Sequence, residues 1–303
     1  MSATTTHSGA NLPPIIFFGT EEHSLIALKA LVDARLPVVA VVTKPDAPRG
    51  RGKQLTAPAV KTFALDHDIA VWQPKKLNDI HDAITQFDHP IGVLVSYGKI
   101  IPQSILDLFT PGIINLHPSL LPKYRGPSPI ESAILNRDSK TGVTIMKLEQ
   151  AMDAGPIYLQ VPYALDFTET KPELYDTLFT LGANLLVQNL PRIIDGSLVP
   201  SEQLEDEASY CSLLRPQDGE IIPAETTPGA AEAKIRAYIG YPKTRIRLGD
   251  YHLIVTKAHG VMTKKTPLDL ECSNGAFLSI DEVIAPRSGK RMSGADFLRG
   301  YPL

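Results

Sequence analysis

The sequence predicts an α/β protein with a doubly wound, mostly parallel β-sheet, followed by a smaller domain of antiparallel strands. Three observations support this fold class. Apolar runs of strand length alternate with segments of helical periodicity over the first two thirds of the chain. These apolar runs are continuous, which is typical of strands that helices cover on both faces. Beyond residue 196, short strands and tight-turn signals replace this pattern.

The elements of the sheet domain follow from their local patterns. The run PIIFFGT predicts the first strand, and further strands are expected at 37–44, 69–73, 91–97, 112–117 and 142–150. Helices are expected at 21–34, 79–87, 104–109, 130–135 and 171–196. Thr20 is expected to cap the first of these helices, because a threonine hydroxyl can accept hydrogen bonds from free backbone N–H groups.

Changes in composition along the chain predict its domain organisation. The expected segments are a disordered tail at 1–12, the sheet domain with the active site at 13–196, a polar and acidic linker at 197–210, and a C-terminal domain at 211–303. The C-terminal domain contains two hairpin signals, one around Gly249 and a strong one at Asn274-Gly275. Short antiparallel strands of this kind suggest a small β-barrel or sandwich.

The overall composition is that of an ordinary soluble protein. The 303 residues are 43% hydrophobic and 21% charged, with a net charge of -3, and no apolar run is long enough to span a bilayer. Cys211 and Cys272 are the only cysteines, too few for a disulfide framework or a cysteine-bound metal cluster. We therefore expect a cytoplasmic, monomeric protein with no membrane partner and no metal.

Charge is distributed unevenly between the two ends of the chain. Residues 231–303 hold 12 Lys+Arg and 7 Asp+Glu, a balance of +5, and the remaining residues hold 18 and 26, a balance of -8. A basic C-terminal domain points to a polyanionic partner. A solvated surface with no partner would explain the same balance, which is well below that of dedicated nucleic-acid binders.

The candidate active site lies where the predicted strand GIINLH ends. In a strand, residues two apart point to the same face, so Asn115 and His117 should converge on one spot at the carboxyl end of the sheet. An Asn amide can donate to a developing oxyanion, and a His can act as an acid or a base near neutral pH. Asp153, after another predicted strand, is the best candidate to orient the imidazole. Alternatively, Asn115 and His117 are buried polar groups that serve only the structure.

Other reaction classes find less support in the sequence. The first strand ends in FFGTEEHS, which has one glycine where a dinucleotide fingerprint needs three. A nicotinamide or flavin cofactor is therefore disfavoured. The chain also has no G-x-S-x-G nucleophile elbow, so the trio of Asn115, His117 and Asp153 indicates acyl transfer without a covalent intermediate.

Three stretches of the sequence carry a family resemblance. The segments INLHPSLLPKYRGPSPI, GVTIMKLEQAMDAGPI and TKPDAPRGRGKQLTAPAVK resemble the methionyl-tRNA formyltransferases, a branch of the folate-dependent formyltransferase family. The resemblance runs along nearly the whole chain. It implies a formyltransferase-like variant of the Rossmann fold, an OB-like C-terminal barrel that binds tRNA, and formyl transfer from 10-formyltetrahydrofolate to methionyl initiator tRNA.

The resemblance also implies roles for individual residues. Asn115, His117 and Asp153 match the family's catalytic residues. The segment that lines the folate site is matched by Ser119, Leu120, Leu121 and Pro122. The loop that enters the tRNA acceptor end corresponds to 44–58, with Arg49, Arg51 and Lys53 interleaved with glycines. In the C-terminal domain, Lys243, Arg245 and Arg247 alternate along a predicted strand and should share one face as tRNA contacts.

One departure from the family pattern concerns the residues that follow Asp153. The usual Asp-Thr-Gly-Asp is Asp153-Ala154-Gly155-Pro156 here, so a second acidic residue is missing. Two other functions remain open on the sequence alone. One is a formyltransferase for a small amine, such as an amino-sugar nucleotide or glycinamide ribonucleotide, and the other is a non-catalytic tRNA- or folate-binding protein.

Overall fold

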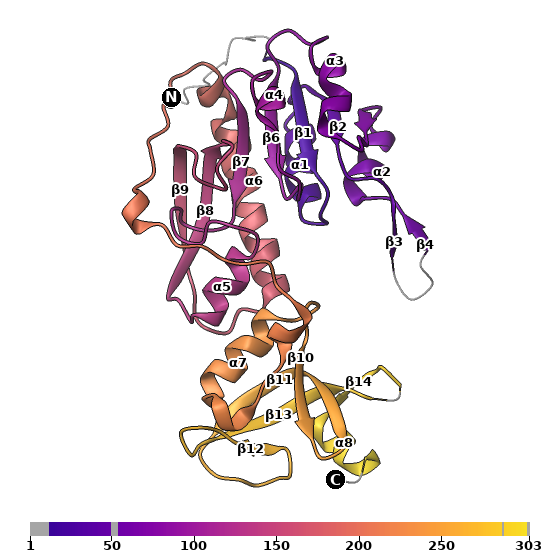
Figure 1. Ribbon diagram of the computed structural model, residues 1–303, viewed down its shortest axis with the longest axis vertical. Helices are drawn as coiled ribbons and strands as arrows, with labels where there is room; N and C mark the ends of the chain where they lie inside the picture. The colour runs from indigo at the N-terminus through magenta and orange to yellow at the C-terminus, as the bar shows by residue number, and fades with distance from the viewer. Residues whose placement is uncertain (1–11, 50–53, 287, 302–303) are drawn as a thin grey trace, which may run out of the picture. The chain divides into compact units, whose positions relative to one another are not determined.

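The computed structural model describes residues 12–49, 54–286 and 288–301. The chain forms two compact units (Figure 1). The first unit comprises Met1–His117, Val143–Gln160 and Phe179–Glu205, and the second comprises Pro118–Gly142, Val161–Leu178 and Asp206–Leu303. The domain boundaries expected at residues 12, 196 and 210 stay predictions.

A seven-stranded sheet forms the centre of the α/β part, in the order β5-β2-β1-β6-β7-β8-β9 (Figure 1). Its strands are β1 (Ile15–Gly19), β2 (Val38–Val42), β5 (Ala70–Trp72), β6 (Ile91–Val95), β7 (Ile113–His117), β8 (Lys140–Lys147) and β9 (Ile157–Ala164). The pairs β2–β5, β1–β2, β1–β6 and β6–β7 are parallel, and β8 runs antiparallel to β7. The prediction of a mostly parallel α/β sheet is confirmed.

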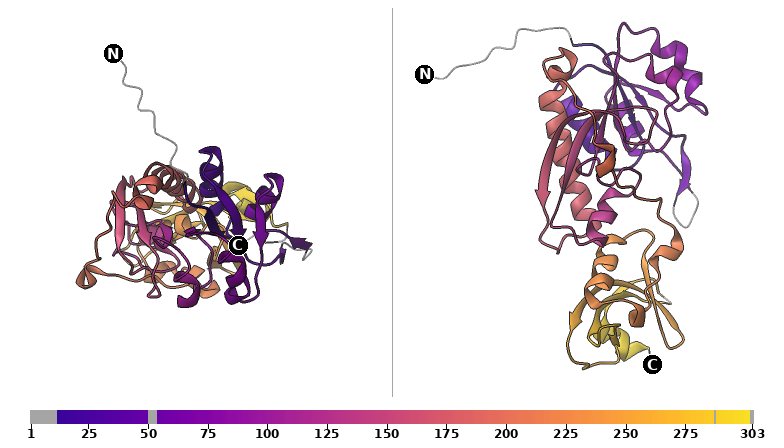
Figure 2. Two further views of the ribbon diagram at one scale, coloured as in Figure 1. Left: turned by 90° about the horizontal axis from the view of Figure 1, so that it is seen from above. Right: turned by 60° about the vertical axis from the view of Figure 1, so that its left-hand side comes forward.

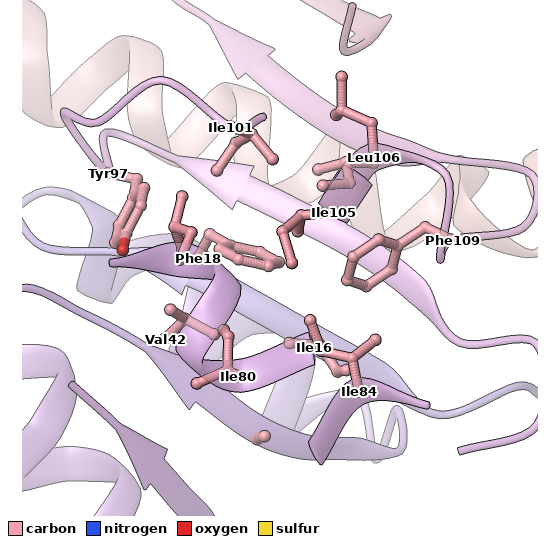
Figure 3. Close-up of a cluster of buried hydrophobic side chains, with 13 residues drawn as sticks. Ile16, Phe18, Val42, Ile80, Ile84, Tyr97, Ile101, Ile105, Leu106 and Phe109 are labelled. Carbon is pink, nitrogen blue, oxygen red and sulfur yellow. The ribbon is translucent and has the colours of Figure 1, made fainter. Parts of the chain in front are cut away.

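Helices cover both faces of this sheet. The helices of this part of the chain are α1 (Ser24–Asp33), α2 (Ala59–Asp66), η1 (Leu77–Ile80), α3 (His81–Ile84), α4 (Gln103–Leu106), α5 (Pro129–Leu135) and α6 (Lys171–Ile194). Figure 3 shows Ile16 and Phe18 of β1 packed with Ile84 of α3 and Ile105 of α4 in one buried cluster. On the other face, α6 approaches β7 so closely that a Cβ at Gly182 would lie 2.6 Å from Leu116 Cδ1.

Several elements differ in detail from the sequence prediction. The expected cap at Thr20 is wrong, because α1 begins only at Ser24 and the Thr20 hydroxyl accepts a hydrogen bond from the Lys44 N–H at 3.2 Å. The sequence also gave no indication of α2, of β9, or of the short hairpin strands β3 (Ala47–Arg49) and β4 (Gln54–Thr56).

The C-terminal part of the second unit is an antiparallel sheet in the order β10-β11-β13-β12, with β14 also paired to β13. Its elements are α7 (Pro228–Ala237), β10 (Thr244–Leu248), β11 (Tyr251–Val261), β12 (Asp269–Glu271), β13 (Phe277–Ile284), β14 (Arg291–Ser293) and α8 (Gly294–Gly300), which Figure 2 shows from two further directions. Both predicted hairpins are confirmed by the pairs β10–β11 and β12–β13. An OB-type barrel stays a prediction, since the described residues include no ladder that closes this sheet.

Candidate active site

Strand β7 presents Asn115 and His117 at the carboxyl end of the parallel part of the sheet. The strand is buried along its whole length, and Asn115 and His117 are each only 5% exposed. Because side chains alternate along a strand, both residues point to the face opposite Leu116. Ile113, two positions earlier, joins the buried cluster of Figure 3 on that same face. The spacing argument from the sequence therefore holds for these two side chains.

Asp153 reaches His117 from the loop that joins β8 to β9. Its Oδ2 lies 3.7 Å from His117 Nδ1, and the two side chains are 15% and 6% exposed. This separation is within ion-pair range but longer than a hydrogen bond. Asp153 adopts a left-handed backbone conformation with φ of 49°, which an aspartate tolerates better than most residues. A partly buried carboxylate at this distance can orient the imidazole.

The loop that carries Asp153 is held by hydrogen bonds and by close packing. Gln203 Nε2 donates to the backbone oxygens of Asp153 at 2.8 Å and Gly155 at 2.7 Å. At the end of the loop, the Lys147 N–H donates to the Pro156 oxygen at 2.9 Å. Gly155 has no room for a side chain, since a Cβ there would lie 2.0 Å from Lys147 O. The sequence placed Gln203 in a linker and assigned it no role in the site.

Thr144 is a second neighbour of His117 that the sequence did not indicate. It pairs directly with His117 across the β7–β8 ladder, so the two side chains point to the same face. Thr144 is fully buried, and its hydroxyl accepts a hydrogen bond from Gln160 Nε2 at 2.8 Å. Nothing in the local pattern distinguishes Thr144 from an ordinary strand residue.

A cavity of about 680 Å³ lies where β7 begins and β8 ends. Its lining includes Gln103, Leu106, Phe109, Ile113, Gln150 and Ala151. Asn115, His117 and Asp153 are not among the residues that line it. A volume of this size lies within the range of roughly 300–1,000 Å³ that small-molecule and cofactor sites occupy.

The predicted folate-lining segment 119–122 forms a tight turn in the second unit. The Ser119 hydroxyl is buried and donates to the Lys123 oxygen at 2.6 Å. Leu121 is buried, the Pro122 oxygen accepts from the Ser209 N–H at 3.1 Å, and Leu120 lies against Gly142. These contacts account for the turn itself, and contact with folate stays a prediction.

The predicted tRNA loop is a hairpin of β3 and β4. Arg51 and Lys53 lie outside the described residues, as does the Arg49 side chain. The base of the hairpin is fastened by Lys61 Nζ, which lies 2.9 Å from both Asp46 carboxylate oxygens. Gln73 Nε2 donates to Asp46 Oδ1 and to the Lys44 oxygen, each at 2.8 Å. The hydrogen bond from Gln73 and then that from Lys61 lower the pKa of Asp46.

The three basic residues predicted on one strand face are not all in the strand. Arg245 and Arg247 lie in β10 and share a face. The prediction that Lys243 belongs to the strand is wrong. Lys243 precedes β10, and its φ of 69° interrupts the extended backbone that a strand requires. Arg245 Nη1 donates to the Pro216 oxygen at 3.2 Å, and Lys243 and Arg247 are exposed. Their contact with tRNA stays a prediction.

The described residues offer neither a metal-binding cluster nor a membrane-spanning helix. No group of three or more His, Cys, Asp or Glu side chains within them is arranged to hold a metal ion. None of their helices has the length and apolarity needed to cross a membrane.

Comparison with known proteins gives consistent results. A sequence model described as formyl transferase matches residues 15–190. The methionyl-tRNA formyltransferase of Janthinobacterium sp. (strain Marseille) is 37% identical over 312 residues, covering 95% of this chain and 98% of the relative. That of Chloroflexus aurantiacus (strain ATCC 29366 / DSM 635 / J-10-fl) is 41% identical over 233 residues, covering 75% of this chain and 74% of the relative.

Solved structures share the same fold. The N-formyltransferase of Helicobacter canadensis, in complex with folinic acid and dTDP-3-aminofucose, superposes with a TM-score of 0.68 at 18% identity, over 89% of this chain and 98% of that one. At this identity the likeness concerns the fold alone. The match over 15–190 and the relatives that align along almost the entire chain place it in a family: this chain belongs to the formyl transferase family and, within it, to the methionyl-tRNA formyltransferases.

Proposed function

We propose that this chain transfers the formyl group of 10-formyltetrahydrofolate to the amino group of methionyl initiator tRNA, in the cytoplasm, as a step of translation initiation. The observation that carries this proposal is the placement of Asp153 beside His117, with Asn115 on the same face of β7. The curated relatives named methionyl-tRNA formyltransferase support the choice of substrate.

The chemistry follows from what each side chain can donate or accept. The neutral amine of the aminoacyl group attacks the formyl carbon, and negative charge grows on the formyl oxygen as the carbon becomes tetrahedral. The Asn115 amide and the protonated His117 ring donate hydrogen bonds to that oxygen. A well-placed donor of this kind typically lowers the barrier by about 3 kcal/mol.

Proton transfer completes the reaction. The new bond joins the amine nitrogen to the formyl carbon, and the bond from that carbon to the folate nitrogen breaks. The amine loses one proton, and the departing folate nitrogen gains one. Asp153 holds the His117 ring in the right orientation, and it can pass the proton from the attacking amine to the departing folate nitrogen, directly or through a water molecule. This scheme requires no second carboxylate, so it accommodates Pro156.

The folate is proposed to bind beside Asn115, His117 and Asp153, since the formyl carbon must lie within reach of the groups that act on it. Ser119, Leu120, Leu121 and Pro122 are proposed to contact the rest of the folate.

The tRNA is proposed to bind through the β3–β4 hairpin and an OB-like C-terminal barrel. Arg49 is the last residue of β3, and Arg51 and Lys53 follow it in the sequence. Lys243 precedes β10, which contains Arg245 and Arg247. Contacts between these cations and phosphates would release counterions, so affinity should fall steeply as salt rises.

The deciding experiment offers several acceptors side by side. Purified protein and 10-formyltetrahydrofolate are incubated with charged initiator tRNA, charged elongator tRNA, an amino-sugar nucleotide and glycinamide ribonucleotide. Formylation of the initiator tRNA with little formylation of the others is the expected result. Preferential formylation of either small amine would replace the proposed acceptor, and no formylation of any acceptor by a folded protein would favour a binding role.

A further inference from the structure

The loop between β8 and β9 is exposed on one side of Asp153 and buried on the other, where Gly155 and Pro156 lie. Four consecutive residues before Asp153, 149–152, are exposed, so burial of apolar side chains does not fix this part of the loop. Asp153 itself has a left-handed backbone, which costs free energy unless surrounding contacts maintain it. The hydrogen bonds that the loop backbone receives therefore act together with the close packing at Gly155 to place the carboxylate.

Gln203 supplies two of those hydrogen bonds from one nitrogen. An amide NH₂ group has two hydrogens, and Gln203 Nε2 donates to the oxygens of Asp153 at 2.8 Å and Gly155 at 2.7 Å. The two acceptors flank Ala154, so the side chain spans the turn that carries the carboxylate. A leucine of similar size has no donor, and a glutamate would face two carbonyl oxygens with an acceptor.

The segment that carries Gln203 is itself fixed to the sheet. The Ser201 N–H donates to the Ile157 oxygen at 2.8 Å, and the Ile157 N–H donates to the Ser201 oxygen at 2.7 Å. Ile157 is the first residue of β9. Ser201 thus ties this segment to the edge of the sheet two residues before Gln203.

We propose that Gln203 is a positioning residue for the formyl-transfer reaction, which holds the Asp153 carboxylate 3.7 Å from His117, where it can orient the imidazole and take the proton of the attacking amine. The residue touches neither substrate in this scheme and acts only through Asp153. This inference rests on the proposed function, in which Asp153 is a catalytic residue.

The experiment compares Gln203→Leu and Gln203→Glu with the wild type in a formyl-transfer assay with charged initiator tRNA. Glu202→Gln is the control, since Glu202 is exposed on the same segment. For both Gln203 variants we expect kcat to fall about tenfold or more, with KM for each substrate and the Tm little changed. The control should behave as the wild type does.

A double-mutant cycle with Asp153→Asn separates positioning from a general structural role. If Gln203 acts through Asp153, Gln203→Leu should lower kcat by less than about twofold in the Asp153→Asn background. Full multiplication of the two effects would overturn the inference, and so would a loss confined to Tm or to KM. Near-normal kcat in folded Gln203→Leu and Gln203→Glu would also overturn it. If Asp153→Asn itself leaves kcat unchanged, the catalytic role of Asp153 fails instead.

Discussion

A single added methyl group at Gly155 should inactivate the enzyme without unfolding it. A Cβ at this position would lie 2.0 Å from the Lys147 oxygen and 3.1 Å from Glu149 Cγ, whereas ordinary contact begins at 3.4 Å. The Lys147 oxygen belongs to β8 and cannot yield easily, so the loop must move by about 1.4 Å (3.4 minus 2.0). Asp153, two residues away, moves with the loop.

The expected loss follows from the geometry of the ion pair. The carboxylate oxygen is already 3.7 Å from His117 Nδ1, so a shift of this size takes it beyond ion-pair range. A misplacement of about 1 Å in an active site can cost about 10²-fold in rate, and we expect Gly155→Ala to lower kcat by roughly 10- to 100-fold. Overpacking should reduce the free energy of unfolding by about 1–3 kcal/mol.

The assay measures formyl transfer to charged initiator tRNA at saturating folate, together with thermal unfolding. Gly300→Ala is the matched control, because among the described residues no atom outside its own helix backbone and its chain neighbours lies within 4 Å of a Cβ at Gly300. A folded Gly155→Ala protein with kcat within about twofold of the wild type would refute the dependence of catalysis on the Asp153 loop.

Four further predictions concern single residues. Asn115→Ala and His117→Ala should each lower kcat by at least ~10²-fold with little change in unfolding free energy, and near-normal turnover of folded His117→Ala would remove the mechanism. Arg51→Ala should raise KM for charged tRNA and leave folate binding intact, and equal activity at low tRNA concentration would contradict it. Lys61→Met removes the 2.9 Å contacts to Asp46 and should also raise KM for charged tRNA. Steady-state kinetics that show a change in KM for folate alone would contradict this prediction. Burial acts to raise the pKa of Asp269, but hydrogen bonds from Ser279 and from the N–H groups of Lys265 and Thr266 outweigh burial and lower the pKa below 3.8. A carboxyl group with a lowered pKa stabilises the folded state at pH values above its ordinary pKa, so Asp269→Asn should cost about 1–3 kcal/mol of unfolding free energy at neutral pH. Urea unfolding should show this difference between variant and wild type disappearing as the pH falls below 3.8.

Sequence patterns predicted the elements of the sheet better than their arrangement. Continuous apolar runs and their flanking signals sufficed for β1, β2, β6 and β7, since a strand buried on both faces can contain little else. The same pattern cannot give direction, so it left open that β8 runs antiparallel to β7. The three-residue strands β3 and β4 are too short for any periodicity, and their Pro- and Gly-rich surroundings are typical of a loop.

The residues of the candidate site also differ in whether the sequence alone could predict them. Asn115 and His117 were predictable because strand geometry alone puts residues two apart on one face. Asp153 was predictable from chemistry, since an imidazole at such a site needs a carboxylate. The role of Gln203 was not predictable from the sequence. Its side chain binds backbone oxygens 50 and 48 residues away, and because every residue has a backbone oxygen, no particular residue type marks the partner.

This difference has a consequence for how the site tolerates change. The β7 side chains are held by the ladders to β6 and β8, so many hydrogen bonds share the task of placing them and the loss of one should matter little. The Asp153 loop has no ladder of its own, and a few contacts from Gln203, Lys147 and the close approach at Gly155 determine its path. Substitutions that impair catalysis without touching a substrate should therefore concentrate around this loop and in the segment that follows α6. Random mutagenesis can test this distribution. If such substitutions are equally frequent around β7, the sheet is no more tolerant of change than the loop.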